Sequence, residues 1–380
     1  MLKISLVTMN NKDLILIDKL FGLILLPFSL AFRSIGIIRR KLNPHNNGEI
    51  LIIKFLGAGN LLSITSTLKK FPCSIITVSA NQPTLKEFGI GDKHYFLNDK
   101  NPLILFFQVI NLSSKLFFYH YSQVINLESE SFFAKFLSTI PTSSKLSGIS
   151  NVHKGLIDSL VYDFYLVTPT LLGKNEIIDL LIQFRPQVNL DIQALVDQRQ
   201  RYFMTSYLKH VKNARNITIA PTCSPTDNLR RLDIGIWQKI CECLGSSLNI
   251  TVIFPSKTDI QYLEFLQLRD RLPQLNIQLC NFSDFISSIK SCELLITIDS
   301  QALHIAQLEG IITIALYGPT SPFGVNLENT SYPLSNSLAC SPCTHKYFLA
   351  PCAGLAPCME LSSVNLEIFK QVGINFGAYE

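Results

Sequence analysis

The sequence is poor in charge. Only 16% of its 380 residues are Asp, Glu, Lys or Arg, whereas 47% are hydrophobic. The 33 basic and 28 acidic residues leave a formal net charge of +5, and no long block of basic residues concentrates it. Because a nucleic-acid-binding surface needs a basic patch or stripe, no nucleic-acid partner is expected. The mild positive excess suits a protein that handles anionic small molecules or contacts an anionic membrane.

The sequence also lacks an uncharged apolar run long enough to cross a membrane. Residues 14–38 are almost wholly apolar, but charged residues interrupt them, and the longest uncharged run, 20–32, is shorter than the roughly 20 residues that a bilayer core requires. Basic residues at 39–41 follow the apolar stretch and no small-residue cleavage site is present, which argues against a signal peptide. We expect the arm 1–47 to be an in-plane anchor on the inner face of the cytoplasmic membrane. A helix that packs on the protein's own surface is the alternative.

Two catalytic patterns are missing as well. The sequence contains neither a G-x-G-x-x-G turn nor a Tyr-x-x-x-Lys pair. A sugar-nucleotide epimerase or dehydrogenase would need both, so that class of enzyme is not expected.

Ten cysteines are present, but a chain of this length without a cleavable signal is expected to keep them as reduced cytosolic thiols. Four of them follow the spacing Cys340-x2-Cys343-x8-Cys352-x5-Cys358, which resembles a four-thiolate zinc site. His345 could replace one thiolate, and disulfides would staple the same loop in an oxidising compartment. The ligand set stays open, and zinc is not favoured.

From Glu49 onward the sequence alternates between strand and helix patterns. The run EILIIKFLG over 49–57 is rich in β-branched residues, as in a buried parallel strand. A helix is expected over 61–70 and a second strand over 73–79, after which a strand over 123–127 precedes a helix over 131–138.

The same alternation restarts in the second half of the chain. A long helix over 191–212 is expected to connect the halves, and the expected elements that follow are strands over 216–220, 249–254, 294–298 and 311–316 with helices over 236–244 and 259–271. This pattern predicts an α/β protein of two Rossmann-like, doubly wound domains. Their ligand cleft is expected between the domains, at the carboxyl ends of the strands.

The residues that carry chemistry follow two strands of the second half. In TIDSQALHIA, residues 297–306, a buried strand ends in an acid and a hydroxyl before a helix that carries a histidine. The N–H groups at the start of such a helix suit a diphosphate. YGPTSP, residues 317–322, is a second tight turn at a strand end, and two such turns side by side form a phosphate cradle.

Together these segments resemble the signature D-S-G-x-x-H-x-A, a strand and G-P-T-S-P of glycosyltransferase family 9, the ADP-heptose:lipopolysaccharide heptosyltransferases. The run IAPTCSPTDNLRRLDIGIW over 219–237 is similar to the family's hydroxyl-rich loop and K-R-W-P segment, and LGAGN, CSPC and PCM add further matches. The resemblance spans 49–369, and several motifs in the right order are more specific than one alone.

The resemblance implies a GT-B fold with a metal-independent, inverting transfer reaction, in agreement with the absence of an Asp-x-Asp motif. Residues 48–205 would receive a lipopolysaccharide core or other lipid-linked glycan, and 206–362 would hold a nucleotide sugar such as ADP-heptose. No cofactor is implied besides this donor substrate. Residues 363–380 are expected to pack back on the N-terminal domain.

The resemblance also assigns the donor-binding residues. Arg230 or Arg231 stands where the family's basic residue binds the donor phosphates, and an arginine fork suits phosphate. Asp299 matches the acid that hydrogen-bonds the transferred sugar, although an N-cap role is the alternative. The further donor-side candidates are Thr226, Ser300, His304, Gly318 and Thr320, of which His304 has the alternative of a core histidine that braces the loop.

The front motif departs from the family pattern. Gly57 and Gly59 keep the acceptor-side loop, but Asn60 occupies the position of the aspartate that acts as general base. An amide cannot take a proton at neutral pH, so Asn60 could only orient the acceptor. Glu128 is the first choice for a substitute base and Glu130 the second. Alternatively, stabilisation of the leaving group supplies most of the catalysis, or the chain is an inactive nucleotide-sugar-binding or scaffold protein.

Overall fold

The computed structural model divides the chain into two compact units, the first ending at Val188 and the second beginning at Asn189, with residues 170–173 grouped with the second. The division falls within residues that the structure does not describe, as does the predicted helix over 191–212, so the boundary at 205–206 stays a prediction. The described residues are 11–42, 48–55, 57–98, 101–129, 131–150, 155–167, 177–178, 181–182, 216–223, 228–322, 330–336, 338, 340–343 and 351–377.

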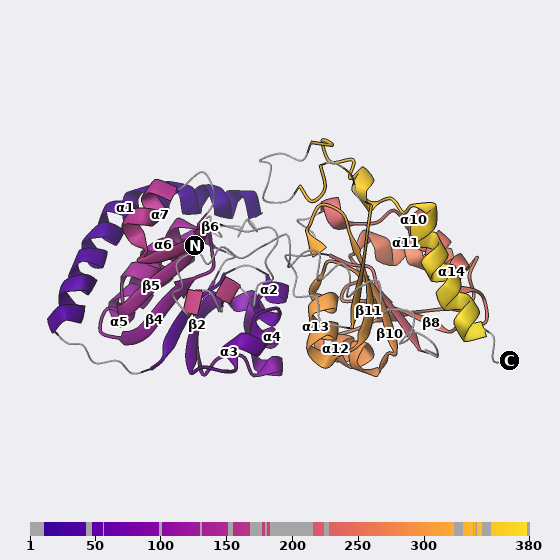
Figure 1. Cartoon of the computed structure of the whole chain (residues 1–380), viewed down its shortest axis with the longest axis horizontal. Coiled ribbons are helices and arrows are strands. Elements are labelled where there is room, and N and C mark those ends of the chain that lie inside the picture. Colours follow the sequence, from indigo (N-terminus) through magenta and orange to yellow (C-terminus); the bar gives the residue numbers. More distant parts are fainter. Residues whose placement is uncertain are drawn as a thin grey trace, which may run out of the picture. The chain divides into compact units, whose positions relative to one another are not determined.

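The N-terminal unit is built on a six-stranded parallel sheet in the order β3-β2-β1-β4-β5-β6 (Figure 1). Its strands are β1 (Ile50–Ile53), β2 (Cys73–Val78), β3 (Lys93–Leu97), β4 (His120–Asn126), β5 (Thr142–Ser150) and β6 (Phe164–Val167). Its helices are α1 (Asn11–Leu42), α2 (Ala58–Leu62), α3 (Thr65–Leu68), α4 (Gln82–Phe88), α5 (Pro102–Leu116), α6 (Phe132–Thr139) and α7 (Gly155–Val161), and a short 3-10 turn η1 (Ser79–Asn81) precedes α4.

The central strand β1 explains why the apolar run after Glu49 could be recognised. All of its residues are buried, and Ile52 lies between Ile75 of β2 and Ile125 of β4. The helix predicted over 61–70 is instead two short helices, α2 and α3. Ser63 and Thr65 donate their hydroxyl hydrogens to backbone carbonyls at the junction, and such bonds compete with helix continuation.

The C-terminal unit has a second six-stranded parallel sheet, in the order β12-β11-β10-β7-β8-β9. Trp237 is fully buried beside Phe265 in its core, with ring centroids 6.1 Å apart. The strands are β7 (Ile217–Ala220), β8 (Ile250–Phe254), β9 (Leu275–Leu279), β10 (Leu294–Ile298), β11 (Ile312–Tyr317) and β12 (Ser331–Ser335). The helices are α10 (Ile234–Leu244), α11 (Ile260–Arg269), α12 (Phe282–Ser291), α13 (Gln301–Glu309) and α14 (Ser363–Gly377), with 3-10 turns η2 (Asn228–Arg230) and η4 (Pro357–Met359).

Both sheets are doubly wound, which confirms the predicted fold class. In each sheet the first strand of the unit lies beside the fourth, so the strand order reverses between β1 and β4 and between β7 and β10. Ligands of doubly wound proteins bind outside the carboxyl ends of the strands at this reversal. A ligand is therefore expected beside the residues that follow these four strands.

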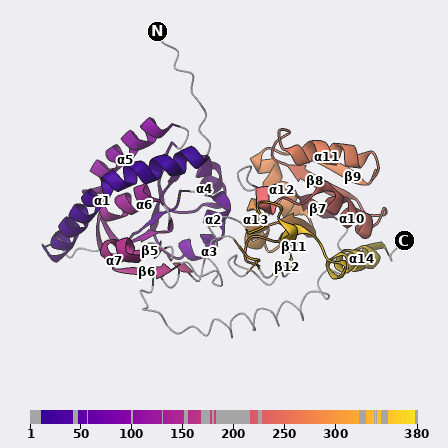
Figure 2. The same cartoon turned by 90° about the horizontal axis from the view of Figure 1, so that it is seen from above.

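Helix α1 packs on the N-terminal unit itself, mainly against α6 (Figures 1 and 2), and its role as an in-plane anchor stays a prediction. The carboxylate of Asp18 accepts hydrogen bonds from the backbone N–H groups of Phe132 and Phe133, each at 2.9 Å, and from the hydroxyl of Ser131. Asp18 therefore caps the first turn of α6. Among the described residues, no helix has both the length and the hydropathy needed to span a membrane.

Helix α14 covers most of the C-terminal segment and lies against α10 of its own unit. The packing of residues 363–380 on the N-terminal domain stays a prediction. Phe369 and Val372 join the buried core of that unit. A Cβ atom on Gly373 would lie 2.6 Å from the carbonyl oxygens of Cys243 and Leu244, so the two helices make a close backbone contact that only glycine permits.

Candidate functional site

The first cluster of predicted site residues lies at the strand reversal of the C-terminal sheet. The Thr297 hydroxyl of β10 donates to the carbonyl of Ala220, the last residue of β7, at 2.7 Å. The same hydroxyl lies 3.2 Å from Oγ of Ser300. These contacts fix the loop after β10 against the end of β7, where a doubly wound sheet binds its ligand.

Arg230 and Asp299 meet in this cluster. Arg230 Nη1 donates to the backbone carbonyl of Asp299 at 2.6 Å and lies 3.5 Å from Asp299 Oδ2. Arg231 lies near Glu264 of α11 instead. Burial raises the pKa of Glu264, and the charge of Arg231 opposes that rise. Of the two arginines that the sequence offered, the structure places Arg230 beside the acid.

Helix α13 begins immediately behind Asp299. Ser300 occupies its N-cap position but makes no side-chain capping hydrogen bond, so its hydroxyl does not occupy the N–H groups of the first turn. His304, one turn further along, is only 4% exposed. The cluster thus combines one guanidinium, one carboxylate and a helix start, a set that can bind both a diphosphate and a sugar hydroxyl.

The turn after β11 is braced by the C-terminal segment. A Cβ atom on Gly318 would lie 2.3 Å from Met359 Sδ and 3.0 Å from Cys358 Sγ, so only glycine fits there. The hydroxyl of Ser341 donates to the carbonyl of Gly318, and Cys343 N donates to the carbonyl of Pro319 at 3.0 Å. The turn is therefore held from two directions.

Two hydroxyl groups of this turn are buried without a hydrogen-bond partner in the described part of the chain, those of Tyr317 and Thr320. Tyr317 is 2% exposed, and burial together with the charge of Asp299 raises its pKa well above the ordinary value. A buried polar group without a partner costs about 1–3 kcal/mol. Each hydroxyl is therefore a candidate for a hydrogen bond with a bound ligand.

The four C-terminal cysteines lie together beside the same turn. Burial raises the pKa of Cys358 to about 11, with further contributions from Cys343, Cys352 and Cys340. Within the described ranges, no group of three or more His, Cys, Asp and Glu side chains could hold a metal ion, and none of the four cysteines forms a disulfide there. His345, the alternative ligand, lies outside those ranges.

The second cluster lies at the strand reversal of the N-terminal sheet. The loop after β1 enters α2 through Gly57, whose φ of 84° is readily adopted only by glycine. Asn60 N donates to the carbonyl of Gly57 at 2.9 Å, and a Cβ atom on Gly57 would lie 2.7 Å from Asn60 Nδ2. The amide of Asn60 therefore folds back over Gly57, while Gly59 lies on α2 between them.

Glu128 follows β4 and reaches the same loop. Its Oε1 lies 2.7 Å from Lys54 Nζ and accepts a hydrogen bond from Phe55 N at 2.8 Å. The side chains of Lys54 and Glu128 are each 12% exposed. Lys54 was not predicted as a site residue, although a lysine at the end of the buried run ILIIK indicated one. Tyr317, which directly precedes the GPTSP turn, was not predicted either. Thr226 and Glu130 lie outside the described residues.

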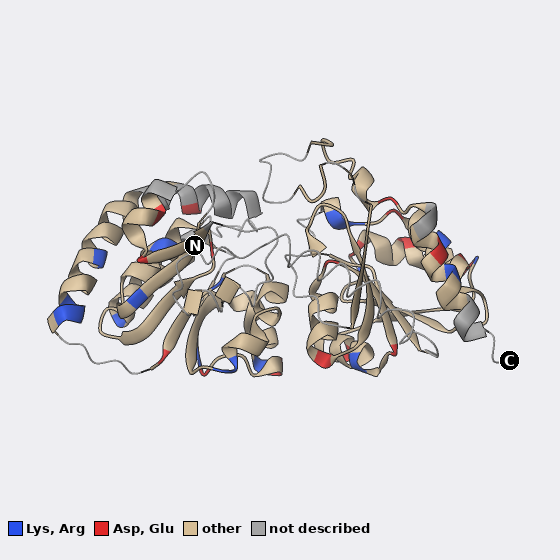
Figure 3. Cartoon of the chain, viewed as in Figure 1, with Lys and Arg blue, Asp and Glu red and all other residues tan. Residues whose placement is uncertain are grey.

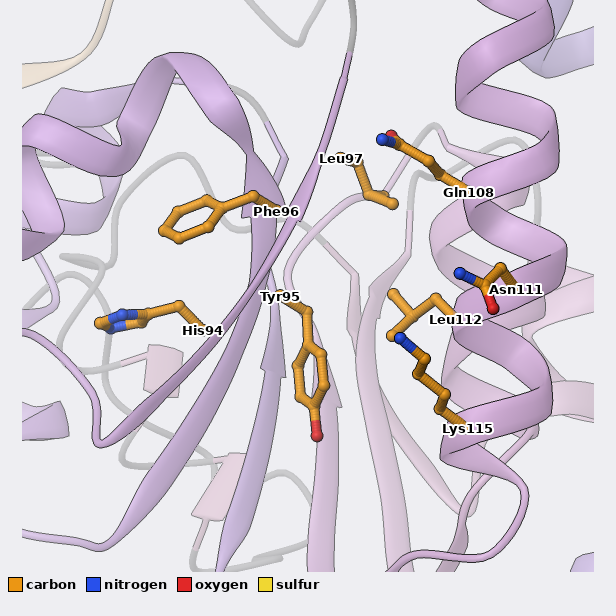
Figure 4. Close-up of a pocket in the computed structure, with 8 residues that line it drawn as sticks. All are labelled: His94, Tyr95, Phe96, Leu97, Gln108, Asn111, Leu112 and Lys115. Atoms are coloured by element: carbon orange, nitrogen blue, oxygen red, sulfur yellow. The ribbon is translucent and has the colours of Figure 1, made fainter.

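A cavity of about 280 Å³ lies elsewhere in the N-terminal unit, between the edge strand β3 and α5 (Figure 4). Its lining includes His94, Gln108, Asn111 and Lys115 but no carboxylate. The cavity therefore lacks a carboxylate that could act in acid–base catalysis. Its lining does not include the residues that follow β1 and β4.

The sequence of residues 111–353 matches glycosyltransferase family 9 (heptosyltransferase). The match covers more than half of the chain, which therefore belongs to this family of glycosyltransferases. No curated protein matches the sequence.

Solved structures of the family share the fold. E. coli heptosyltransferase WaaC with ADP-2-deoxy-2-fluoro heptose is similar with a TM-score of 0.53 and 11% identity, over 76% of this chain and 93% of that one. The family 9 glycosyl transferase from Veillonella parvula DSM 2008 is similar with a TM-score of 0.56 and 14% identity, over 76% of this chain and 86% of that one. E. coli ADP-heptose lps heptosyltransferase II is similar with a TM-score of 0.53 and 14% identity, over 77% of this chain and 91% of that one. The predicted GT-B type of fold is thereby confirmed.

Proposed function

We propose that this protein is an inverting glycosyltransferase that moves a heptose-like sugar from a nucleotide diphosphate donor to a lipid-linked glycan. ADP-heptose is the proposed donor, and a lipopolysaccharide core or a related glycan is the proposed acceptor. The observation that carries the proposal is the meeting of Arg230 and Asp299 beside the start of α13, at the strand reversal of the C-terminal sheet. Membership of glycosyltransferase family 9 supports the reaction class.

In the proposed reaction, an acceptor hydroxyl attacks the anomeric carbon of the donor sugar. The bond from that carbon to the diphosphate breaks, the nucleotide diphosphate leaves with the electron pair, and the anomeric configuration inverts. Arg230 and the N–H groups at the start of α13 stabilise the leaving phosphates, while Asp299 hydrogen-bonds the sugar. With these cationic and dipolar groups in place, no metal ion is needed.

In this proposal, Glu128 is the general base that takes the proton of the acceptor hydroxyl. Two observations support this role: Glu128 lies at the carboxyl end of β4 beside the β1 loop, and the contacts of its Oε1 with Lys54 and Phe55 fix the carboxylate in position. A general base must be held within hydrogen-bond reach of the proton it takes. Asn60, at the family position of the base, orients the acceptor.

The test uses the purified full chain with a panel of nucleotide sugars and lipid-extract acceptors. Glu128→Gln should lower kcat for transfer by about 10²-fold or more, while the dissociation constant of the nucleoside diphosphate stays within a few-fold. Glu87→Gln is the matched control, because Glu87 is exposed on α4 of the same unit. An unchanged kcat in Glu128→Gln would remove Glu128 from the mechanism.

A second variant separates the base from a structural role. Asn60→Asp in the Glu128→Gln background places a carboxylate at the family position and should recover part of the lost kcat. If neither variant nor the native chain shows transfer or donor hydrolysis while nucleoside diphosphates still bind, the second candidate function replaces the first. Asn60 is the observation that favours that candidate, a nucleotide-sugar-binding or scaffold protein without transferase activity.

The protein is also proposed to work at the inner surface of the cytoplasmic membrane. A lipid-linked acceptor would be reached there, and α1 supplies the apolar surface for attachment.

A further inference from the structure

One face of α1 is apolar and exposed although the opposite face is packed on the protein. The exposed fractions of Ile24, Phe28 and Leu42 are 63%, 55% and 79%. Leu25 and Ser29, on the other side, are buried. At 3.6 residues per turn, the large exposed hydrophobic residues of α1 fall on one side of the helix; they are Leu20, Ile24, Phe28, Ile35, Ile38 and Leu42.

The inner face of α1 is fixed by specific polar contacts. Besides the Asp18 cap on α6, Arg33 pairs with Asp163, and Arg39 and Arg40 donate to backbone carbonyls of Phe117 and Ser144. These contacts orient the helix about its own axis. The exposed apolar face of α1 therefore points away from the core of the unit.

Helix α5 of the same unit carries exposed hydrophobic residues as well. Ile104, Phe107 and Ile110 are exposed on α5, with Phe107 at 66%, and Phe118 just beyond the helix is 75% exposed. Phe117, just beyond the end of α5, contacts α1, since its ring lies edge-on to Phe32 with the ring centroids 6.0 Å apart. Large contiguous apolar patches are rare on monomeric soluble proteins and mark interaction sites.

The charged residues within the two segments that carry these exposed hydrophobic side chains have one sign. From Leu20 to Leu42 and from Pro102 to Phe118 the sequence contains no Asp or Glu. Lys41 and Lys115 are exposed at the C-terminal ends of the two helices, and Figure 3 shows basic residues toward that end of α1. A second copy would bring cations against cations, whereas an anionic surface is complementary.

We infer that the outer faces of α1 and α5 form one docking surface for an anionic lipid bilayer. Apolar side chains enter the boundary between headgroups and acyl chains, while Lys41 and Lys115 contact lipid phosphates. The helix lies in the plane of the interface, since it is long enough to span a membrane but not apolar enough. The inference rests on the membrane attachment in the proposed function and adds the surface, its second helix and the lipid charge.

The experiment measures binding of the full chain to vesicles by flotation, without nucleotide sugar or acceptor. Vesicles of equimolar phosphatidylcholine and phosphatidylglycerol should bind the protein more tightly than phosphatidylcholine vesicles. The double variant Ile24→Glu, Phe28→Glu should lower the partition coefficient by about 10-fold or more. Lys41→Glu should weaken binding to the anionic vesicles by a few-fold and leave binding to neutral vesicles unchanged.

The matched control is Ile260→Glu with Leu263→Glu on α11 of the other unit, whose exposed fractions are 60% and 58%. This control should bind vesicles like the native chain. Ile38→Glu is a milder variant should the first double variant unfold. Native-like binding of both α1 variants, or no binding by the native chain, would overturn the inference. If the native chain does not bind vesicles but forms concentration-dependent dimers that Ile38→Glu abolishes, this face is instead an interface with a second copy of the chain. Because no substrate is present, these results are independent of transferase activity.

Discussion

Arg230 Nη1 donates to the backbone carbonyl of Asp299 at 2.6 Å and lies 3.5 Å from the Oδ2 atom of the same residue. One guanidinium therefore connects the segment after β7 with the segment after β10, across the strand reversal. The remaining N–H groups of an arginine fork can bind phosphate oxygens while this contact holds the side chain in place.

The first prediction concerns the two neighbouring arginines. Arg230→Gln should raise the dissociation constant of a nucleoside diphosphate by about 10-fold or more, because hydrogen bonds to charged groups are worth about 1.5–3 kcal/mol. Arg231→Gln is the control and should change it by less than a few-fold, since Arg231 lies near Glu264 instead. Isothermal titration calorimetry measures both. Equal losses in the two variants would contradict the assignment.

A second prediction follows from the buried hydroxyl of Tyr317. Tyr317→Phe should raise the free energy of unfolding of the unliganded protein by about 1 kcal/mol, because a buried hydroxyl without a partner is removed. The same change should weaken nucleoside-diphosphate binding if the ligand supplies the missing partner. Urea denaturation with and without the ligand gives both quantities. Tyr332→Phe is a suitable control, since Tyr332 is only half-buried on β12. Destabilisation of the unliganded protein would show that the hydroxyl already has a partner.

The central parts of both sheets could be predicted because their strands are short, apolar and fully buried, as β1 and β10 are. The edge strands could not. Of β3, with the sequence KHYFL, only Leu97 is buried, so its pattern does not differ from that of a polar loop. Strand β5 could not be predicted for a similar reason: it is mostly buried, but its serines and its lysine give it the pattern of a polar segment.

The candidate site was predictable only as far as it follows strand ends. Asp299 directly follows β10 and Glu128 is the second residue after β4, and parallel strands bring their carboxyl ends to one edge. The pairing of Glu128 with Lys54 depends on the neighbouring position of β1 and β4, which the strand order determines and a local pattern does not. The contact of α14 with α10 could not be predicted for the same reason: an apolar helix face fits any core, and tertiary packing selects its partner.

A third prediction concerns stability. Lys135 Nζ lies 2.6 Å from Asp158 Oδ1, and the two side chains are 2% and 0% exposed. Lys135→Met should lower the free energy of unfolding by about 3–5 kcal/mol, because it leaves a buried carboxylate without its cation. The matched control is Lys290→Met, since Lys290 pairs with Glu309 at 3.0 Å but is 45% exposed. That change should cost less than about 1 kcal/mol in urea denaturation. Similar effects at both sites would contradict the role of burial.

The last prediction concerns the thiols beside the Gly318 turn. Backbone hydrogen bonds from Ala356 and Gly354 lower the pKa of Cys352, whereas burial raises that of Cys358 to about 11. The thiolate is the reactive form, so a lowered pKa means a larger reactive fraction at neutral pH and a raised pKa a smaller one. Iodoacetamide should therefore alkylate Cys352 first, and the pH at which its alkylation rate is half-maximal should lie below the ordinary thiol pKa.

Peptide mass spectrometry over a pH series measures this order. Cys358 serves as the internal control and should react only slowly at neutral pH, because it is both buried and protonated there. Cys352→Ser should remove the fast phase without changing the rate at the other cysteines. If Cys358 reacts as fast as Cys352 in the native protein, the segment that braces Gly318 opens in solution, and the close contact with Met359 does not persist.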